Sequence, residues 1–276
     1  MSELPPARPL ASAPTAAPPP AATSSGGWRD RLRRAARRLM SIAGVALVIM
    51  TAQVTFVRFV DPPATITMLQ RAAATVGSED GARWVDYRPL DAEAQGHHLP
   101  RMAVASEDGW FFQHHGFDLG QLGAVLRSLG GGGSPRGAST ISQQTAKNLF
   151  LWQGRSYVRK ALEVPYTLLL ELIVPKERIL ELYLNIAETG PMTFGAEAGA
   201  QRWFSKPANE LSAKEAARLI SILPYPEGWN VSDERAEARA REIMANRVPF
   251  PGETGFDEMV EQAPARIGWS ALLRGR

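Results

Sequence analysis

The sequence predicts a mostly α-helical protein with one transmembrane helix near its N-terminus. Residues 39–57 contain no charged residue, which is typical of a membrane span. Between about residues 100 and 247, the apolar residues recur mostly at helical spacing. No segment alternates apolar and polar residues regularly enough to predict a large sheet.

The composition supports a sizeable core and excludes several kinds of site. The 276 residues are 45% hydrophobic and include no cysteine, which excludes disulfides, thiolate metal sites and a cysteine nucleophile. The four histidines form two adjacent pairs and no HExxH motif, so we expect no zinc hydrolase. Residues 1–38 hold seven arginines against two acidic residues, so with a net charge of +3 the rest is slightly acidic. We therefore expect no nucleic-acid partner.

Residues 1–38 are predicted to form a disordered, basic tail on the cytoplasmic side. Residues 1–27 contain seven prolines and seven alanines, a composition that buries too little apolar surface to offset the entropy lost on ordering. The arginines at positions 29–38 follow directly before the uncharged segment. By the positive-inside rule, this block places the tail in the cytoplasm and everything after about residue 60 across the membrane.

The uncharged segment 39–57 is predicted to be an uncleaved membrane anchor. Its nineteen residues, at about 1.5 Å each, just span a hydrocarbon core of about 30 Å. A buried core helix is the first alternative, but an arginine block rarely precedes one. A signal peptide is the second, but its apolar region would be shorter and a small-residue cleavage site would follow.

After the anchor we expect a stem at 58–99, a helical domain at 100–249 and a C-terminal tail at 250–276. Residues 176–187 place apolar side chains on one helical face. A capping box at 212–215 predicts a helix that ends before Pro224, and Ser232 is expected to cap a charged helix over 233–248. The glycines of residues 129–137 predict a mobile loop within the domain.

The first candidate for catalysis is Glu107. Glu107 and Asp108 precede an aromatic cluster (Trp110, Phe111 and Phe112) and the pair His114–His115. Flanking aromatic rings are expected to keep the Glu107 carboxylate reactive near neutral pH, as a general base requires. An acidic pair at a helix end is the structural alternative.

Two further blocks carry polar and cationic side chains suited to sugars and phosphates. The first, residues 136–148, includes Arg136, Ser139, Thr140, Gln143, Gln144 and Lys147. Its hydroxyls, amides and ammonium bind sugar hydroxyls and phosphate oxygens, while Ser139 or Thr140 is also suited to capping a helix. The second, residues 155–163, holds Arg155, Arg159, Lys160 and Glu163. It forms either an anion site with a second carboxylate or a helical salt bridge between Arg159 and Glu163.

Taken together, the motifs are far more specific than any one alone. The chain contains EDxxFxxHxG from Glu107, GASTxxQQ ending at Gln144 and RKxxE ending at Glu163. They are followed by ILExYLNxxxxGxxxxG, which includes Asn185, and by the Leu-Pro-Tyr-Pro block at 223–226. In this order and spacing they resemble the peptidoglycan glycosyltransferase family, and the single anchor resembles its monofunctional biosynthetic branch.

The resemblance implies a lysozyme-like helical glycosyltransferase domain with a small membrane-apposed lobe. It implies polymerisation of lipid II into glycan strands, with inversion at the anomeric carbon and release of undecaprenyl pyrophosphate. Glu107 would take the proton from the acceptor 4-hydroxyl, and Glu163 would assist at the donor side or organise the cations. The residues implied to bind substrate are Arg136, Ser139, Thr140, Gln143, Gln144, Lys147, Arg155, Arg159, Lys160 and Asn185.

The resemblance also implies a cellular location and protein partners. The chain would be a single-pass protein of the bacterial inner membrane with a periplasmic catalytic domain, acting with cell-division or elongation proteins. The sequence shows no protein-built metal cage, and Mg²⁺ or Mn²⁺ held mainly by the substrate pyrophosphate is compatible with it. Two alternatives stay open: an anchored, lysozyme-like enzyme that cleaves glycan, and a non-catalytic scaffold for wall assembly. The cations argue against the first and the two retained glutamates against the second.

Overall fold

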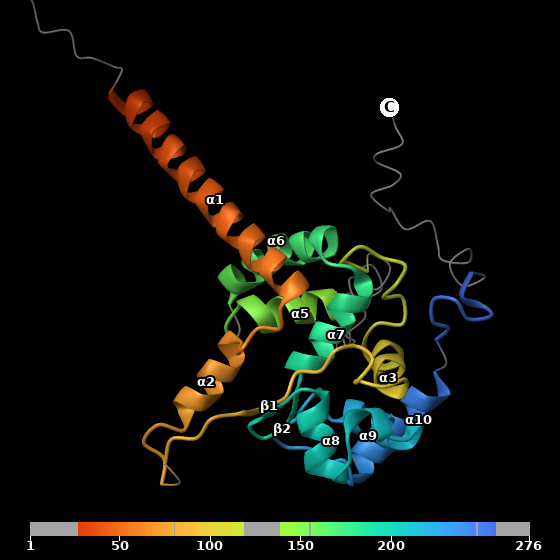
Figure 1. The fold of residues 1–276 in the computed structure, drawn as a ribbon. Helices are drawn as coiled ribbons and strands as arrows, with labels where there is room; N and C mark the ends of the chain where they lie inside the picture. Colours follow the sequence, from red (N-terminus) through yellow and green to blue (C-terminus); the bar gives the residue numbers. More distant parts are fainter. Residues whose placement is uncertain (1–26, 80, 119–138, 155, 247, 258–276) are drawn as a thin grey trace, which may run out of the picture. The chain divides into compact units, whose positions relative to one another are not determined.

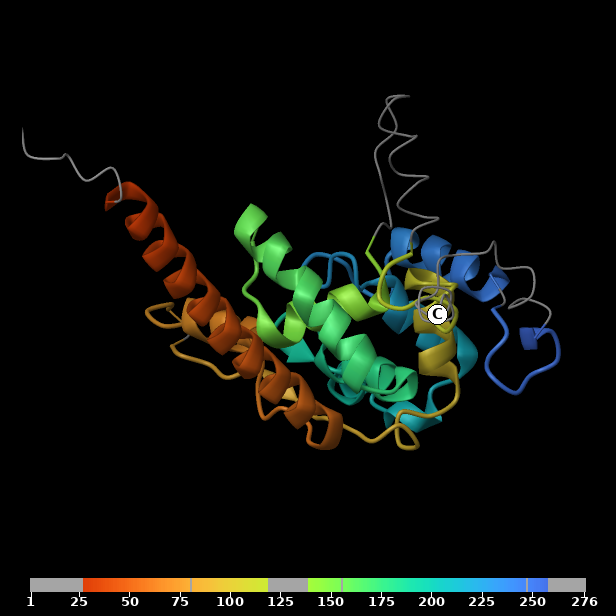
Figure 2. The same cartoon turned by 90° about the horizontal axis from the view of Figure 1, so that it is seen from above.

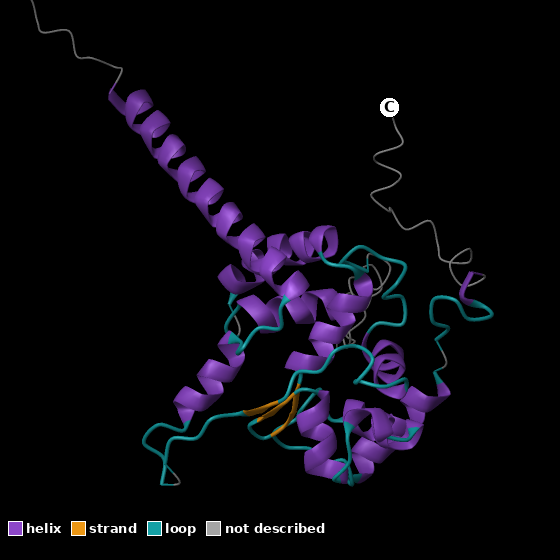
Figure 3. Cartoon of the chain, viewed as in Figure 1, coloured by secondary structure: helices purple, strands orange, loops and turns teal. Residues whose placement is uncertain are grey.

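A computed structural model describes residues 27–79, 81–118, 139–154, 156–246 and 248–257. These residues are mainly helical with one small sheet (Figure 3), which confirms the predicted fold class. The chain divides into two compact units, Met1–Leu47 and Val48–Arg276. The predicted loop at 129–137 lies outside the described residues, as do residues 1–26 of the predicted tail.

Helix α1 (Gly27–Phe59) is longer than the predicted anchor. The arginine block at 29–38 forms its first turns instead of belonging to a disordered tail, because arginine is a good helix former and no proline interrupts the segment. The helix is long and apolar enough to cross a membrane. Large apolar side chains such as Met40 and Val48 are exposed along it, as a lipid-facing helix requires.

The last turns of α1 belong to the second unit and pack into its core. Met50, Val54 and Val57 are buried there. The guanidinium of Arg178 donates to the carbonyl oxygen of Val57 at 3.1 and 3.2 Å. The C-terminal end of α1 is therefore a structural part of the folded domain.

The second unit contains eight further α-helices among the described residues, shown in Figure 1. They are α2 (Ile66–Ala74), α3 (His98–Glu107), α5 (Ile141–Phe150), α6 (Tyr157–Ile173), α7 (Lys176–Ile186), α8 (Ala196–Phe204), α9 (Ala213–Ser221) and α10 (Glu234–Ala245). A short 3₁₀ helix, η1, covers Ala208–Glu210. Helix α7 and the capping box of α9 confirm two sequence predictions.

One predicted helix start is wrong. Helix α10 has Asp233, not Ser232, at its N-cap. The Asp233 carboxylate does not cap the helix, because it accepts a hydrogen bond at 2.8 Å from the backbone N–H of Asn230 in the preceding turn. Both residues are good caps by type, so the sequence could not choose between them.

Two helical groups surround the core. Helix α5 packs against α6 and α7, while α3 packs against α9 and α10, and Figure 2 shows α3 beside α10. The fully buried side chains Ile141, Leu170 and Ile179 come from α5, α6 and α7 respectively. The end of α3 and the start of α5 are thus held against one core.

A three-stranded sheet combines one strand that precedes α3 with two strands that lie between α7 and α8. Strands β1 (Asp86–Tyr87), β2 (Glu188–Gly190) and β3 (Thr193–Phe194) are arranged β1-β3-β2. Strand β3 is parallel to β1 and antiparallel to β2, with Phe194 opposite Glu188. Residues directly opposite each other share a face, so Glu188 and Phe194 lie on one face of the sheet.

Candidate active site

Glu107 is the last residue of α3, and polar side chains hold its carboxylate. Oε1 accepts hydrogen bonds from Ser106 and from Arg239 of α10, both at 2.8 Å. Oε2 accepts one from the side-chain amide of Gln144 at 3.2 Å. The Glu107 side chain is 15% exposed. The carboxylate is thus oriented by three donors and still accessible to a substrate proton.

The expected aromatic surroundings of Glu107 take a different form. Phe111 is fully buried, and its ring makes edge contacts with Phe112 and His114. The hydrogen-bond partners of Glu107 come instead from α3, α5 and α10. Phe111 is therefore part of the core, whereas Trp110 and Phe112 are only partly buried.

Asp108 joins α3 to the start of α5. Its buried carboxylate accepts a hydrogen bond from Nε2–H of His114 at 2.8 Å and one from the backbone N–H of Ile141 at 3.0 Å. Nδ1 of His114 accepts the Gly116 N–H at 3.1 Å, which assigns the proton to Nε2. Asp108 therefore satisfies one of the free N–H groups at the start of α5.

Helix α5 begins with a capping box that uses two of the predicted substrate-binding residues. The Thr140 hydroxyl accepts the Gln143 N–H at 3.2 Å, and the Gln143 side chain accepts the Thr140 N–H at 3.0 Å. Both side chains are buried. The structure therefore gives Thr140 and Gln143 structural positions, while exposed Ser139 offers its carbonyl oxygen to Gln144 at 3.4 Å.

Gln144 and Lys147 follow on α5 and line a pocket of about 260 Å³. Residues three apart on a helix lie on the same side, so Gln144 reaches Glu107 while Lys147 faces the pocket. Burial lowers the pKa of Lys147, and the nearby Glu163 carboxylate opposes this effect. The Lys147 ammonium has no hydrogen bond or ion pair to a described residue. It is a cation available to an anionic ligand.

Glu163 lies in α6 between two cations. Its buried carboxylate pairs with Arg159 at 3.0 Å and with Lys160. Arg159 also donates from Nε to the carbonyl oxygen of Gly154 at 2.9 Å. The helical salt bridge expected from the sequence is thus present. Glu163 thus pairs with two cations of its own helix, and the helix continues through Pro165.

Asn185 is not among the residues that line this pocket. It is fully buried, and its side chain bonds the backbone of Leu90 in both directions at 3.1 and 2.8 Å. It also accepts from the Gln95 amide at 2.8 Å. Asn185 therefore anchors the segment before α3. Arg136 and Arg155 lie outside the described residues.

The sequence analysis missed Arg239, whose guanidinium contacts the Glu107 carboxylate. It also missed three charged residues that line the same pocket as Lys147, namely Arg71, Glu188 and Glu227. These residues carry no recognisable motif. Only the pairing of α10 with α3 and of α2 with β2 reveals them.

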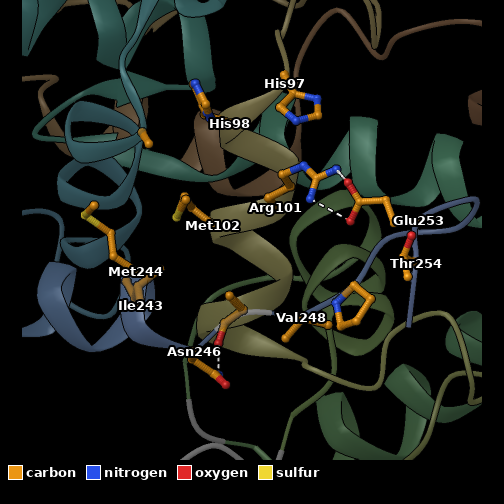
Figure 4. Close-up of a pocket in the computed structure, with 13 residues that line it drawn as sticks. His97, His98, Arg101, Met102, Ile243, Met244, Asn246, Val248, Glu253 and Thr254 are labelled. Carbon is orange, nitrogen blue, oxygen red and sulfur yellow. Dashed lines mark hydrogen bonds and ion pairs between the residues drawn. The ribbon is translucent and has the colours of Figure 1, made fainter. Parts of the chain in front are cut away.

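A larger pocket of about 500 Å³ lies on another side of α3 (Figure 4). Arg101 pairs there with Glu253, and its guanidinium stacks over the ring of Phe250 at 4.9 Å. Asn246 donates to the carbonyl oxygen of Ala105 at 2.8 Å. These contacts tie the segment after α10 to α3 and leave Glu107 free.

Within the described ranges, no group of three or more histidine or acidic side chains is arranged to hold a metal ion. The candidate site residues that the structure describes carry carboxylate, amide and cationic groups.

Comparison with known sequences assigns the family. The sequence model described as Transglycosylase matches residues 72–248. A biosynthetic peptidoglycan transglycosylase of Ectopseudomonas mendocina is 43% identical over 236 residues, which cover 84% of this chain and 97% of that protein. Similar proteins of the same name occur in Rhodospirillum centenum, at 45% identity over 78% of this chain and 90% of that protein, and in Xanthomonas oryzae pv. oryzae, at 43% over 79% and 89%. These matches, which confirm the resemblance seen in the motifs, show that the chain belongs to the transglycosylase family.

Proposed function

We propose that the chain polymerises lipid II into glycan strands with inversion at the anomeric carbon, releasing undecaprenyl pyrophosphate. One observation carries the proposal: three residues apart, α5 holds a contact to the candidate base and a lysine that forms no ion pair with another described residue. Gln144 bonds Glu107, and Lys147 lies beside Glu163. A proton acceptor and a pyrophosphate-binding cation are the two groups that this reaction needs.

Glu107 is the proposed general base. Its carboxylate takes the proton of the acceptor 4-hydroxyl while that oxygen attacks the anomeric carbon of the donor. The bond from this carbon to the pyrophosphate oxygen breaks, so the electron pair leaves with the pyrophosphate. Ser106, Gln144 and Arg239 keep the carboxylate in place throughout, as preorganised catalysis requires.

Lys147, Arg159 and Lys160 are the proposed ligands of the donor pyrophosphate. Cations stabilise the charge that develops on a departing phosphate. Glu163 accepts from Arg159 and Lys160, and these contacts support an organising role for it. By the predicted motif, Arg136, Arg155, Ser139 and Gln144 border the same groove.

The membrane is the proposed setting of this reaction. Tyr157, Val158 and Leu172 of α6 are exposed, as is Phe59 at the end of α1, and exposed apolar surface of this kind favours a bilayer contact. The domain boundaries expected from the sequence, with a cytoplasmic tail and a periplasmic catalytic domain at the inner membrane, are part of the proposal. Partners in division or elongation are a further part.

The direct test is incubation of the purified full chain with lipid II in detergent. We expect glycan strands and free undecaprenyl pyrophosphate. Cleavage of preformed glycan, with no strands made from lipid II, would favour the lysozyme-like hydrolase instead. Neither activity, together with co-localisation with wall-assembly proteins, would favour the scaffold.

A further inference from the structure

Glu188 has a carboxylate oxygen without a partner at the wall of the Lys147 pocket. Oε2 accepts two hydrogen bonds from Arg71, at 2.9 and 3.3 Å. Oε1 is buried and has no hydrogen-bond partner among the described residues. The side chain is only 10% exposed and lines the pocket. Buried polar atoms are nearly always satisfied, so this oxygen requires an explanation.

Two neighbours of Glu188 in the structure supply no further donor to Oε1. Its neighbour on the same face of the sheet is Phe194, which is apolar and fully buried. Arg71 already pairs with both Oε2 of Glu188 and Glu227. Neither neighbour supplies a further donor to Oε1, and a ligand in the pocket is a source of one.

Lys147 and Glu188, which both line the pocket, have surroundings of different charge. The charges acting on Lys147 are those of Glu163, Arg159 and Lys160, whereas those acting on Glu188 are Arg71 and Glu227. Among the described residues, the lining thus includes an ammonium without an ion pair and a carboxylate whose buried Oε1 has no hydrogen-bond partner. Such a pocket fits a ligand that is anionic at one end and rich in N–H or O–H donors at the other.

A sugar linked to pyrophosphate has this chemistry. Its phosphates carry the negative charge, and its hydroxyl and acylamino groups are neutral donors. The pocket holds about 260 Å³, slightly below the usual range for a drug-sized ligand, so it accommodates a group of the size of one sugar ring.

We propose that Oε1 of Glu188 accepts a hydrogen bond from a hydroxyl or acylamino N–H of the sugar whose pyrophosphate is bound at Lys147. The proposal rests on the proposed function and assigns to Glu188 the recognition of the sugar. A site built around a hydrogen bond rejects analogues that lack the donor, because the protein group is then left unpaired.

The test uses Glu188→Gln in the background of Glu107→Gln, so that binding is measured without turnover. A glutamine at 188 must present its carbonyl oxygen to the Arg71 donors, which turns its NH₂ toward the pocket and places donor against donor. We expect lipid II to bind about tenfold more weakly, the typical loss for a hydrogen bond to a charged group. Undecaprenyl pyrophosphate, which has no sugar, should bind equally to both proteins.

Asp86→Asn is the matched control. Asp86 pairs with Arg88 on the same sheet, and both side chains are about half exposed. Its side chain borders a different pocket from that of Lys147. This variant should bind both ligands as the parent does. Glu188→Asp, which shortens the reach but keeps the charge, should weaken only lipid II.

Three results would overturn the assignment. Unchanged lipid II binding in Glu188→Gln would mean that Oε1 faces water alone, and equal weakening of both ligands would mean that Glu188 acts through Arg71 or the fold. Failure of the parent to bind lipid II would also overturn it. Loss of polymerisation in wild type with intact, Glu188-dependent binding would instead reject only the proposed function.

Discussion

The guanidinium of Arg239 lies 2.8 Å from Oε1 of Glu107, although 131 residues separate them in the chain. The contact brings α10 onto the end of α3 and makes the position of the candidate base depend on a helix outside the recognisable motifs. Arg239 is therefore a positioning residue for the carboxylate.

Arg239→Ala should lower kcat for lipid II polymerisation by about ten- to a hundredfold, because a small misplacement of a catalytic group is costly. KM should change less than kcat, and Arg239→Lys should restore part of the rate. Arg241→Ala, which removes an exposed arginine from the same helix, is the control. An equal fall in both variants would show a general effect on α10.

Glu107→Gln should lower the polymerisation rate by about 10²–10⁴, because it removes the proton acceptor while keeping the shape of the side chain. Lipid II binding should stay near normal, since the amide oxygen can still accept from Arg239. Single-turnover rates and equilibrium binding measure the two effects separately. A variant with more than about a tenth of the wild-type rate would transfer the general-base role to Glu163.

Lys147 should impose an alkaline limit on the reaction. Burial lowers the pKa of its ammonium, so the cation loses its proton at a lower pH than an exposed lysine does. The rate at limiting lipid II should fall as the pH rises through that lowered pKa, and Lys147→Ala should be strongly impaired at every pH. Lys147→Arg keeps its charge at high pH. If its rate declines at the same pH as that of wild type, another group sets the limit.

Asp108→Ala should destabilise the fold rather than the chemistry. It leaves the buried Nε2–H of His114 and the N–H of Ile141 without their acceptor, and each such loss costs about 1–3 kcal/mol. The expected decrease in the free energy of unfolding is about 2–5 kcal/mol, measured by denaturant titration. The neighbouring Glu107→Gln should leave this free energy within about 0.5 kcal/mol of wild type. If both variants lost the same free energy of unfolding, the assignment of a structural role to Asp108 and a catalytic role to Glu107 would be contradicted.

The topology can be measured with reporters fused after Arg276. The arginines of 29–38 precede the uncharged segment, so the C-terminal end should lie outside the cytoplasm. An alkaline phosphatase fusion should be active and a cytoplasm-dependent fluorescent fusion dark. The reverse pattern would reject both the orientation and the periplasmic catalytic domain.

The sequence predicted elements with strong local signals and missed those that depend on tertiary contacts. The capping box at Ser212 and the apolar face of α7 are local, and the structure contains both. The small sheet was missed because strands of two or three residues are too short to show an alternating pattern. A cap was expected near Ser139 or Thr140, but only the structure shows that Gln143 completes it and is thereby buried.

The same limit applies to the site. Gln144 and Lys147 were expected in a substrate groove, and both line a pocket. Arg239 was not expected, because a helix rich in both acidic residues and arginine gives no sign of which arginine turns inward. Asn185 belongs to a motif, yet its amide holds the backbone of Leu90. A motif records that a residue type is required and does not distinguish binding from architecture.

Because Gln144 and Lys147 both lie on α5, the geometry of this helix fixes the spacing between them. A rise of about 1.5 Å per residue separates them by about 4.5 Å along the helix axis. The capping box at Thr140 fixes the residue at which the helix begins. In the proposed reaction, the attacking oxygen and the leaving phosphate have to fit that fixed interval. Inserting one residue between Gln144 and Lys147 would preserve every functional group and yet turn the lysine by about 100° about the helix axis. The relative placement of Gln144 and Lys147 therefore depends on the regular geometry of α5.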